Sequence, residues 1–354
     1  MGKTVDRKFC ASSWLMFRTI VDGGRCFAEN IKEYHISPPE TRWNVHDSLE
    51  LEAALRRGMA EATEGETTAL ALSGGIDSAI LAKMMPRGSS AYTFKCVVPG
   101  VEVVDETPMA ARYAEECGLK HRIVEVYWED MERLGPVLMR HKGAPCHSIE
   151  IQICKAAMEA LGDGAKKIVF GESADIVYGG MSGLLSKDWT IGEFIDRYSY
   201  VLPYKVLRKP LLITRPYEEW TRDGYTDVHG FLNKTMYEEA INSYANACAT
   251  AGIELHMPFS KTILDVPLDY ARIRRGENKY LIREIFERLY PGWKVPDKIP
   301  MPRPLNEWLK AWEGPRHREF WAHCTDSMTG DQKWYVFALE RFFEMLDNHE
   351  YDCE

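Results

Sequence analysis

The chain has 354 residues, of which 45% are hydrophobic, 27% charged and 11% aromatic, and its formal net charge is -9. These fractions are typical of a globular protein and exclude disordered, collagen-like and coiled-coil organisation. The sequence contains neither the ~20 consecutive apolar residues of a membrane helix nor the apolar core of a signal peptide, so we expect a cytoplasmic protein. Its negative net charge argues against general binding to nucleic acid.

The first 45 residues are expected to form a short extended or hairpin-like lead-in. They mix aromatic residues with glycines and end close to a Ser-Pro-Pro sequence. We expect residues 46–354 to form one domain. It begins with a helix over residues 48–63, where apolar side chains share one face and Ser48 suits the N-cap position.

Short apolar segments then alternate with helical ones. Strands are predicted at residues 68–72, 91–98, 122–126 and 167–170, and helices at 78–85, 106–117 and 149–161. Strands separated by helices of this length pair in parallel through right-handed crossovers. The sequence therefore predicts an α/β fold with an open, mostly parallel sheet and helices on both faces. After about residue 189 the strand signals fade, which predicts a mostly helical C-terminal part.

The sequence Ser-Gly-Gly-Ile-Asp-Ser at residues 73–78 follows the first predicted strand and opens a helix. Its glycines let the backbone approach a phosphate, and amides at a helix start favour an anion. Asp77 would repel a bound phosphate unless a divalent cation lies between them. The loop is not a Walker A sequence, since no Gly-Lys-Ser/Thr closes it. A bound phosphate with Mg²⁺ is therefore favoured over a purely structural turn.

The nine cysteines are scattered without a Cys-x-x-Cys pair or a zinc-type cluster, which favours free thiols in a reducing compartment. Cys146 and His147 are adjacent, so their side chains should point apart, and packing is favoured over a nucleophile and base pair. The apolar stripe within residues 334–346 predicts a helix packed on the core.

A second motif, Gly-Glu-Ser-Ala-Asp at residues 171–175, follows the strand predicted at 167–170. Two carboxylates three residues apart beyond a strand end suit a site where one binds a metal and the other handles protons. A helix cap is the simpler interpretation. The cap interpretation is less favoured here, because ligands of open α/β sheets bind at the carboxyl ends of the strands, where the phosphate loop also lies.

Five segments together resemble the synthetase domain of the asparagine synthetase family, whose relatives include β-lactam synthetases and lasso-peptide cyclases. Residues 73–78 resemble its pyrophosphate loop, the N-type PP-loop of ATP pyrophosphatases, and residues 171–175 resemble its acidic motif. Residues 254–259 and 277–284 resemble two further family segments. The proline-rich residues 291–309, which include Lys298, resemble the loop that carries the family's catalytic lysine. The resemblance spans residues 46–312.

This resemblance implies an adenine nucleotide alpha hydrolase-like fold of the HUP type and an ATP- and Mg²⁺-dependent ligase. A small carboxylic acid would be adenylated with release of pyrophosphate, and ammonia or another amine would displace AMP to give an amide. ATP and pyrophosphate would be bound by Ala71, Ser73, Gly74, Gly75, Asp77, Ser78, Cys96, Val97 and Gly171. Asp77 and Asp175 would bind Mg²⁺, Glu172 would assist the amine, and Lys298 would stabilise developing charge.

The sequence also departs from the family. Glutamine-using members begin with a cysteine nucleophile and a glutaminase domain, whereas here Gly2 is the second residue and the phosphate loop begins at residue 73. We expect no glutaminase, so a separate protein supplies the amine, or free ammonia or another amine is used. Ser173 and Ile176 replace a family Gly and Glu, and a basic run at 140–147 replaces a Glu-Thr pair. The identity of the acid therefore stays open.

Two alternatives use the same loop. An RNA-thiolating PP-loop enzyme usually has paired cysteines and a basic surface, and this sequence has neither. A non-catalytic nucleotide-binding adapter would not need the catalytic and metal candidates together. Lys279 and Arg283, four residues apart on a predicted helix, are either a solvated pair or a phosphate clamp. Membrane and nucleic acid are not expected partners, and assembly into a homo-oligomer stays open.

Overall fold

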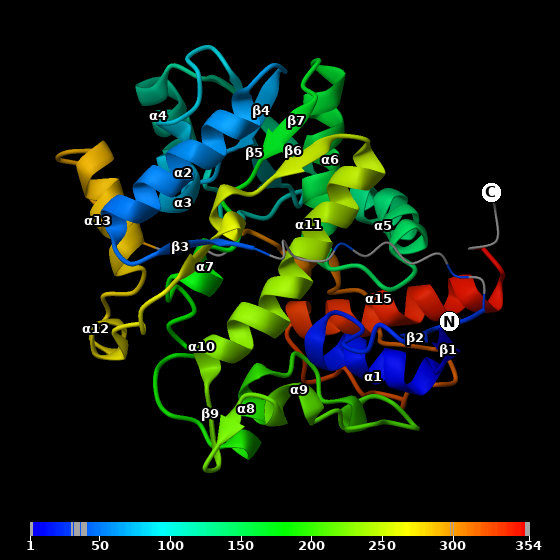
Figure 1. Ribbon diagram of the computed structural model, residues 1–354. Coiled ribbons are helices and arrows are strands. Elements are labelled where there is room, and N and C mark those ends of the chain that lie inside the picture. The colour runs from blue at the N-terminus through cyan, green and yellow to red at the C-terminus, as the bar shows by residue number, and fades with distance from the viewer. Residues whose placement is uncertain are drawn as a thin grey trace.

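A five-stranded parallel sheet lies at the centre of the structure, with helices packed around it (Figure 1). The computed structural model describes residues 3–29, 31, 36, 41–297, 299 and 301–350. The strands lie in the order β10 (Glu254–His256), β7 (Lys167–Val169), β4 (Thr68–Ala71), β5 (Ser90–Cys96) and β6 (Lys120–Val126). Every neighbouring pair is parallel, which confirms the predicted fold class. All residues of β4 are buried, because a central strand is covered on both faces.

Two groups of helices flank the sheet (Figure 1). One group comprises α2 (Ser48–Thr63), α3 (Ile76–Ala82), α4 (Thr107–Cys117) and α13 (Tyr280–Leu289). The other comprises α5 (Trp128–Lys142), α6 (Ser148–Gly162) and α11 (Tyr237–Ala251). The helices predicted at 48–63, 106–117 and 149–161 agree with α2, α4 and α6 to within one residue at each end. The N-cap of α2 is Asp47 rather than Ser48, because the Asp47 carboxylate accepts from the backbone N–H groups of Leu49 and Glu50.

The N-terminal segment is helical over α1 (Arg7–Phe17), so the extended or hairpin-like prediction is wrong there. Asp6 caps this helix, and residues 10–17 are all buried, partly against α15 (Gly330–Asp347). Tertiary burial on all sides removes the one-sided apolar pattern that identifies a surface helix. Two short parallel strands, β1 (Thr4–Val5) and β2 (Arg25–Cys26), flank α1. Residues 30, 32–35 and 37–40 of the predicted lead-in lie outside the described residues.

The C-terminal part is mostly helical, as predicted, but it also supplies β10, which the sequence pattern did not reveal. A three-residue strand is too short for a clear alternation. Further strands are β3 (Trp43–Val45), β8 (Thr221–Arg222), β9 (Tyr225–Thr226) and β11 (Thr262–Leu264). The remaining helices are α7 (Ala174–Val177), α8 (Ile191–Tyr198), α9 (Arg215–Glu218), α10 (Val228–Phe231), α12 (Tyr270–Arg274) and α14 (Leu305–Trp308). Two 3-10 turns occupy Pro203–Lys205 and Pro258–Lys261.

A π-helical turn at Leu232–Met236 joins α10 to α11, so the chain is helical from Val228 to Ala251. The predicted core stripe of the last helix is confirmed, since Trp334, Ala338, Phe342 and Met345 are all at most 1% exposed. Within the described part of the chain, none of the helices has both the length and the apolar character needed to cross a membrane.

Candidate functional site

A cavity of about 330 Å³ opens at the carboxyl ends of the central strands. The ends of β4, β5 and β7 lead into it. Its wall also includes Arg18, the starts of α6 and α11, the loop before α13, and residues 295–297, 299, 301 and 303 of the proline-rich segment. The predicted residues that line it are Ala71, Ser73, Gly75, Asp77, Ser78, Gly171, Glu172, Asp175, Lys279 and Arg283. Parallel strands bring both predicted motifs to one edge of the sheet, as expected.

The phosphate loop connects β4 to α3 and is held by its own serines. The Ser73 and Ser78 hydroxyls lie 2.9 Å apart, and the Ser78 hydroxyl accepts from the backbone N–H of Ser73. Gly75 is the N-cap of α3 and supplies no side chain, so no side-chain cap covers the first amides of this helix. The first turn of α3 therefore presents its backbone N–H groups toward the cavity, whereas the backbone N–H of Gly75 donates to the Ser73 hydroxyl.

The second motif passes close to the phosphate loop at Gly171, where a glycine leaves room for the close approach. A Cβ atom at Gly171 would lie 3.2 Å from both Asp77 Cβ and the backbone nitrogen of Ser78. This close approach explains why a glycine follows β7 at this point. It also fixes the distance between the two motifs.

Lys279 joins the two acidic residues that the resemblance assigns to Mg²⁺. Its Nζ lies 2.5 Å from Asp77 Oδ2 and 2.8 Å from Asp175 Oδ1. Burial alone would lower the pKa of Lys279, but the two carboxylates raise it above its ordinary value, so the ammonium stays charged. Lys279 is 6% exposed and is therefore not part of a solvated pair. Arg283 instead donates to the carbonyl and side-chain oxygens of Asn278.

The paired carboxylates fit a Mg²⁺ site of the kind shared with a nucleotide. Among the residues that the structure describes, no group of three His, Cys, Asp or Glu side chains forms a metal site made by protein alone. Mg²⁺ usually takes one or two carboxylates and completes its shell with phosphates and waters. Asp77 and Asp175, close enough to share one ammonium, provide such a pair.

Glu172 faces the cavity and is half-buried. Burial raises the pKa of its carboxyl, while hydrogen bonds from the Ser173 backbone N–H and the Tyr244 hydroxyl oppose this effect. Ser173 adopts a left-handed conformation with φ 76° and begins α7. Its side chain does not cap that helix, so the motif is not a capping box. A carboxyl with a raised pKa is suited to proton transfer near neutral pH.

Glu106 is a site residue that the sequence reasoning missed. Its Oε2 accepts from the backbone N–H of Gly74 at 3.1 Å. Burial raises the pKa of Glu106 to about 6. The residue stands at the N-cap of α4, where the sequence pattern gave only a helix start. Glu106 and Gly74 are 32 residues apart, and only the passage of the chain through β5 brings them together, so no local sequence pattern predicts their contact.

Three other predicted residues lie outside the cavity wall. Cys96 is buried and its thiol donates to the carbonyl of Pro302, and neither Cys96 nor Val97 lines the cavity. From β5 it is Thr93 and Phe94 that do so. Gly74 lines a neighbouring cavity of about 740 Å³ that shares Gly75 and Glu106 with the first. Lys298 lies outside the described residues.

Of residues 140–150 and His256, only two line the cavity. His147 and Ile149 line the cavity, whereas His256 pairs with Glu254 at 2.6 Å and faces elsewhere. Cys146 does not line the cavity, and burial raises the pKa of its thiol while burial lowers the pKa of His147. These two groups therefore do not form a thiolate and imidazolium pair.

Comparison with known proteins places these features in context. The family model described as asparagine synthase matches residues 50–351. No curated protein matches the chain.

Solved structures with similarity to this chain include three proteins. The ammonia-dependent NAD synthetase of Campylobacter jejuni is 13% identical, with 38% of this chain and 61% of that chain covered and a TM-score of 0.25. A predicted tRNA methyltransferase subunit of Methanocaldococcus jannaschii is 14% identical, with 64% of this chain and 93% of that chain covered and a TM-score of 0.23. NMN synthetase of Francisella tularensis is 12% identical, with 72% of this chain and 99% of that chain covered and a TM-score of 0.27. The chain thus spans less than two thirds of the NAD synthetase.

Proposed function

Because the chain belongs to the asparagine synthase family, whose members are ATP-using synthetases, we propose that it is an amide-forming ligase that adenylates a carboxylic acid. The oxygen of the substrate carboxylate attacks the α-phosphorus of ATP, and the bond between the α-phosphorus and the bridging oxygen breaks. Acyl-adenylate and pyrophosphate result. Ammonia or another amine then attacks the acyl carbon, loses a proton and expels AMP.

One observation carries this proposal. The phosphate loop, the Asp77 and Asp175 pair and the half-buried Glu172 open into a single cavity, although they come from strands about a hundred residues apart. A nucleotide-binding module alone needs the loop, but it has no use for a carboxyl of raised pKa beside it. The combination supports catalysis over passive binding.

Each group has a role that its position supports. The amides and hydroxyls of residues 73–78 bind the pyrophosphate portion of ATP. Asp77 and Asp175 would hold Mg²⁺, which would neutralise phosphate charge there. Lys279, already between these carboxylates, stabilises charge that develops on the bridging oxygen. Lys298 is assigned a similar role by the family resemblance alone.

Glu172 acts on the amine. An ammonium ion cannot attack, and the attacking nitrogen must lose a further proton after the new bond forms. The carboxylate of Glu172, held by the Tyr244 hydroxyl, accepts that proton. The amine is free ammonia, another small amine or a product delivered by a separate protein.

The test is a pyrophosphate-release assay on the full-length protein with ATP, Mg²⁺ and a panel of carboxylic acids, with and without ammonium. We expect at least one acid to yield pyrophosphate and AMP in equal amounts, and an amide by mass spectrometry when the amine is present. The variant Glu172→Gln should keep acid-dependent pyrophosphate release and lose amide formation. Accumulation of ADP instead of AMP would contradict adenylation, and ATP binding without turnover for any acid would indicate an adapter.

A further inference from the structure

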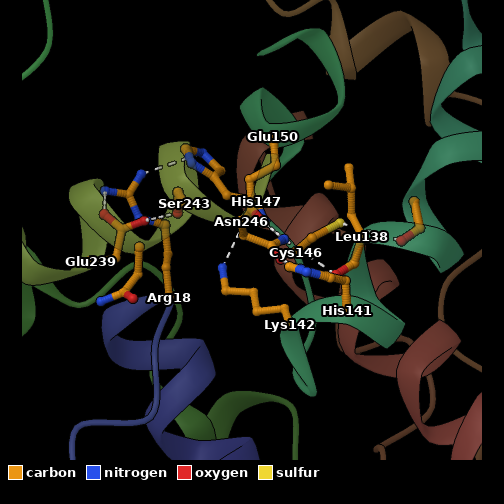
Figure 2. A network of polar contacts seen from close by, with 12 residues as sticks. Arg18, Leu138, His141, Lys142, Cys146, His147, Glu150, Glu239, Ser243 and Asn246 are labelled. Carbon is orange, nitrogen blue, oxygen red and sulfur yellow. Dashed lines mark hydrogen bonds and ion pairs between the residues drawn. The ribbon is translucent and has the colours of Figure 1, made fainter. Parts of the chain in front are cut away.

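One end of the cavity is formed by residues from three distant parts of the chain: Arg18, His147 and Glu239 (Figure 2). Nη2 of Arg18 donates to Oε2 of Glu239 at 2.7 Å, and its Nη1 lies 3.4 Å from Nε2 of His147. The guanidinium also stacks over the Tyr200 ring, 4.1 Å from its centroid. Arg18 precedes residues 50–351, so the family domain alone does not supply it.

Two hydrogen-bond donors in this cluster have no acceptor among the residues that the structure describes. Since arginine can only donate, Nε2 of His147 must accept, and the imidazole proton is then on Nδ1. Burial and the positive charges of Arg18, Arg303 and Lys142 lower the pKa of His147, which keeps the ring neutral. Nδ1 of His147 and Nε of Arg18 are both buried and make no hydrogen bond within the described part of the chain. Buried donors of this kind are normally satisfied by a partner.

The cluster is held rigidly by its surroundings. Glu150 accepts from the backbone N–H of His147, from Lys142 Nζ and from Asn246 Nδ2, all within 2.7 Å (Figure 2). Arg18 itself adopts a left-handed conformation with φ 61° at the end of α1. A non-glycine residue keeps such a backbone only where surrounding contacts impose it. The geometry is therefore preorganised before any ligand binds.

The charge at this end of the cavity favours an anion. Arg18 and Arg303 line it as cations and His147 is neutral. The carboxylate of Glu239 and the carboxyl of Glu172, whose pKa burial raises, offset part of this positive charge. Asp331, the ion-pair partner of Arg303, does not line the cavity. The cluster also lies beside the reaction centre, because Tyr244, the hydrogen-bond partner of Glu172, is on α11 with Glu239.

We propose that Arg18, with His147, binds a second anionic group of the acid substrate, so that the enzyme selects dicarboxylic over monocarboxylic acids. This inference rests on the proposed function. One carboxylate lies near the phosphate loop for adenylation, and the other accepts from the two unsatisfied donors. The helix that precedes the family domain thereby becomes part of the substrate site, and Arg18 is its specificity-determining residue.

The experiment compares matched acids on the full-length protein. Succinate is paired with butanoate and glutarate with pentanoate, so each pair shares a chain length and differs by one carboxylate. Pyrophosphate release gives kcat and KM, and calorimetry with each acid gives binding without turnover. The main variant is Arg18→Gln with Glu239→Gln, because losing Arg18 alone would leave a buried carboxylate unpaired. The control is Arg7→Gln, on the same helix but paired with Asp347 at the surface.

We expect the wild type and the control to prefer at least one diacid over its partner by about tenfold or more in kcat/KM. The double variant should lose this preference, mainly through a higher KM for the diacid, with monoacid values within about threefold. An ATP affinity near that of the wild type reports a folded site. If the double variant does not fold, Arg18→Lys, which keeps the charge and loses the Nε donor, should weaken diacid binding selectively.

The outcomes separate the two proposals. Diacid binding that is lost in the double variant supports this inference even if no acid yields pyrophosphate, a result that would reject only the proposed function. If neither diacid binds the wild type more tightly than its partner, or if the variant keeps the preference, the inference is wrong.

Discussion

Lys279 holds the two acidic motifs together through a single ammonium group. Removing it leaves the Asp77 and Asp175 carboxylates facing each other in a partly buried site, where like charges repel. A divalent cation could take its place. We therefore expect Lys279→Ala to lower the melting temperature in chelator, and Mg²⁺ to restore more of it than in the wild type.

The same variant should lose pyrophosphate release by about a hundredfold or more, since a positioned charge at the reaction centre is removed. Thermal denaturation with chelator and with Mg²⁺ checks the first expectation. Lys187→Ala, which removes a surface pair with Glu193, is the matched control. An identical Mg²⁺ response in both variants would argue against a cation site at these carboxylates.

Glu106 is expected to make the folded protein less stable as the pH rises. Burial raises its pKa from 4.5 to about 6. The folded state therefore binds this proton more tightly than the unfolded state, and stability falls as the pH rises from about 4.5 to 6. Above that window the ionised carboxylate destabilises the fold by roughly 2 kcal/mol, an upper figure because residual solvent screens the charge.

Glu106→Gln keeps an acceptor for the Gly74 N–H and removes the charge. We expect its free energy of unfolding in urea to exceed that of the wild type at pH 7.5, with little difference at pH 4.5. Glu66→Gln, at an exposed position, should show no such contrast. Equal behaviour of the two variants at both pH values would mean that Glu106 titrates normally.

At the scale of elements, the loop after α7 packs against Asp175 and Lys279 and so fixes the position of their side chains. A Cβ atom at Gly180 would lie 1.9 Å from Asp175 Oδ1 and 2.5 Å from Lys279 Cε. Gly180→Ala should therefore displace both side chains while leaving the sheet intact. We expect pyrophosphate release to fall by about a hundredfold, as positioning errors near 1 Å can produce.

Circular dichroism should show unchanged helix content in the same variant. Gly162→Ala, at the end of α6 with open space around the new methyl group, is the control and should behave as the wild type. If Gly180→Ala retains full activity, the loop does not constrain the acidic pair.

The strands and helices around the phosphate loop could be predicted because their apolar patterns are long and local. The buried run at β4 and the glycines that follow it place the loop directly, and the same holds for β7 and its acidic motif. Lys279 was recognised only as one of a spaced pair, since its contact with Asp77 spans 202 residues. Helix α1 was missed because burial of residues 10–17 on all sides leaves no polar face along most of its length. Sequence patterns report local periodicity, and distant contacts leave no such trace.

At the scale of the whole molecule, the first and last helices form one packing unit (Figure 1). Trp14 is fully buried, its indole N–H donates to the carbonyl of Tyr335, and their rings meet edge to face at 6.0 Å. Trp14→Ala should lower the free energy of unfolding by about 3–5 kcal/mol, because a large cavity forms in a packed core.

Urea denaturation followed by far-UV circular dichroism measures this change. The control is Leu49→Ala on α2, where the Leu49 side chain is 64% exposed. It should lower the free energy of unfolding by well under 1 kcal/mol, on the order of surface substitutions in general. A similar small effect for Trp14→Ala would show that α1 unfolds separately from the rest of the molecule.

The pairing of α1 with α15 has a consequence for biosynthesis. Roughly 300 residues separate Phe17 from Gly330, so at a translation rate of ~5–20 residues per second the first helix leaves the ribosome roughly 15–60 s before its partner exists. Its apolar side chains stay without their native cover for that interval. Packing of α1 against its native partner therefore waits for the synthesis of α15, and until then its apolar side chains are open to non-native contacts.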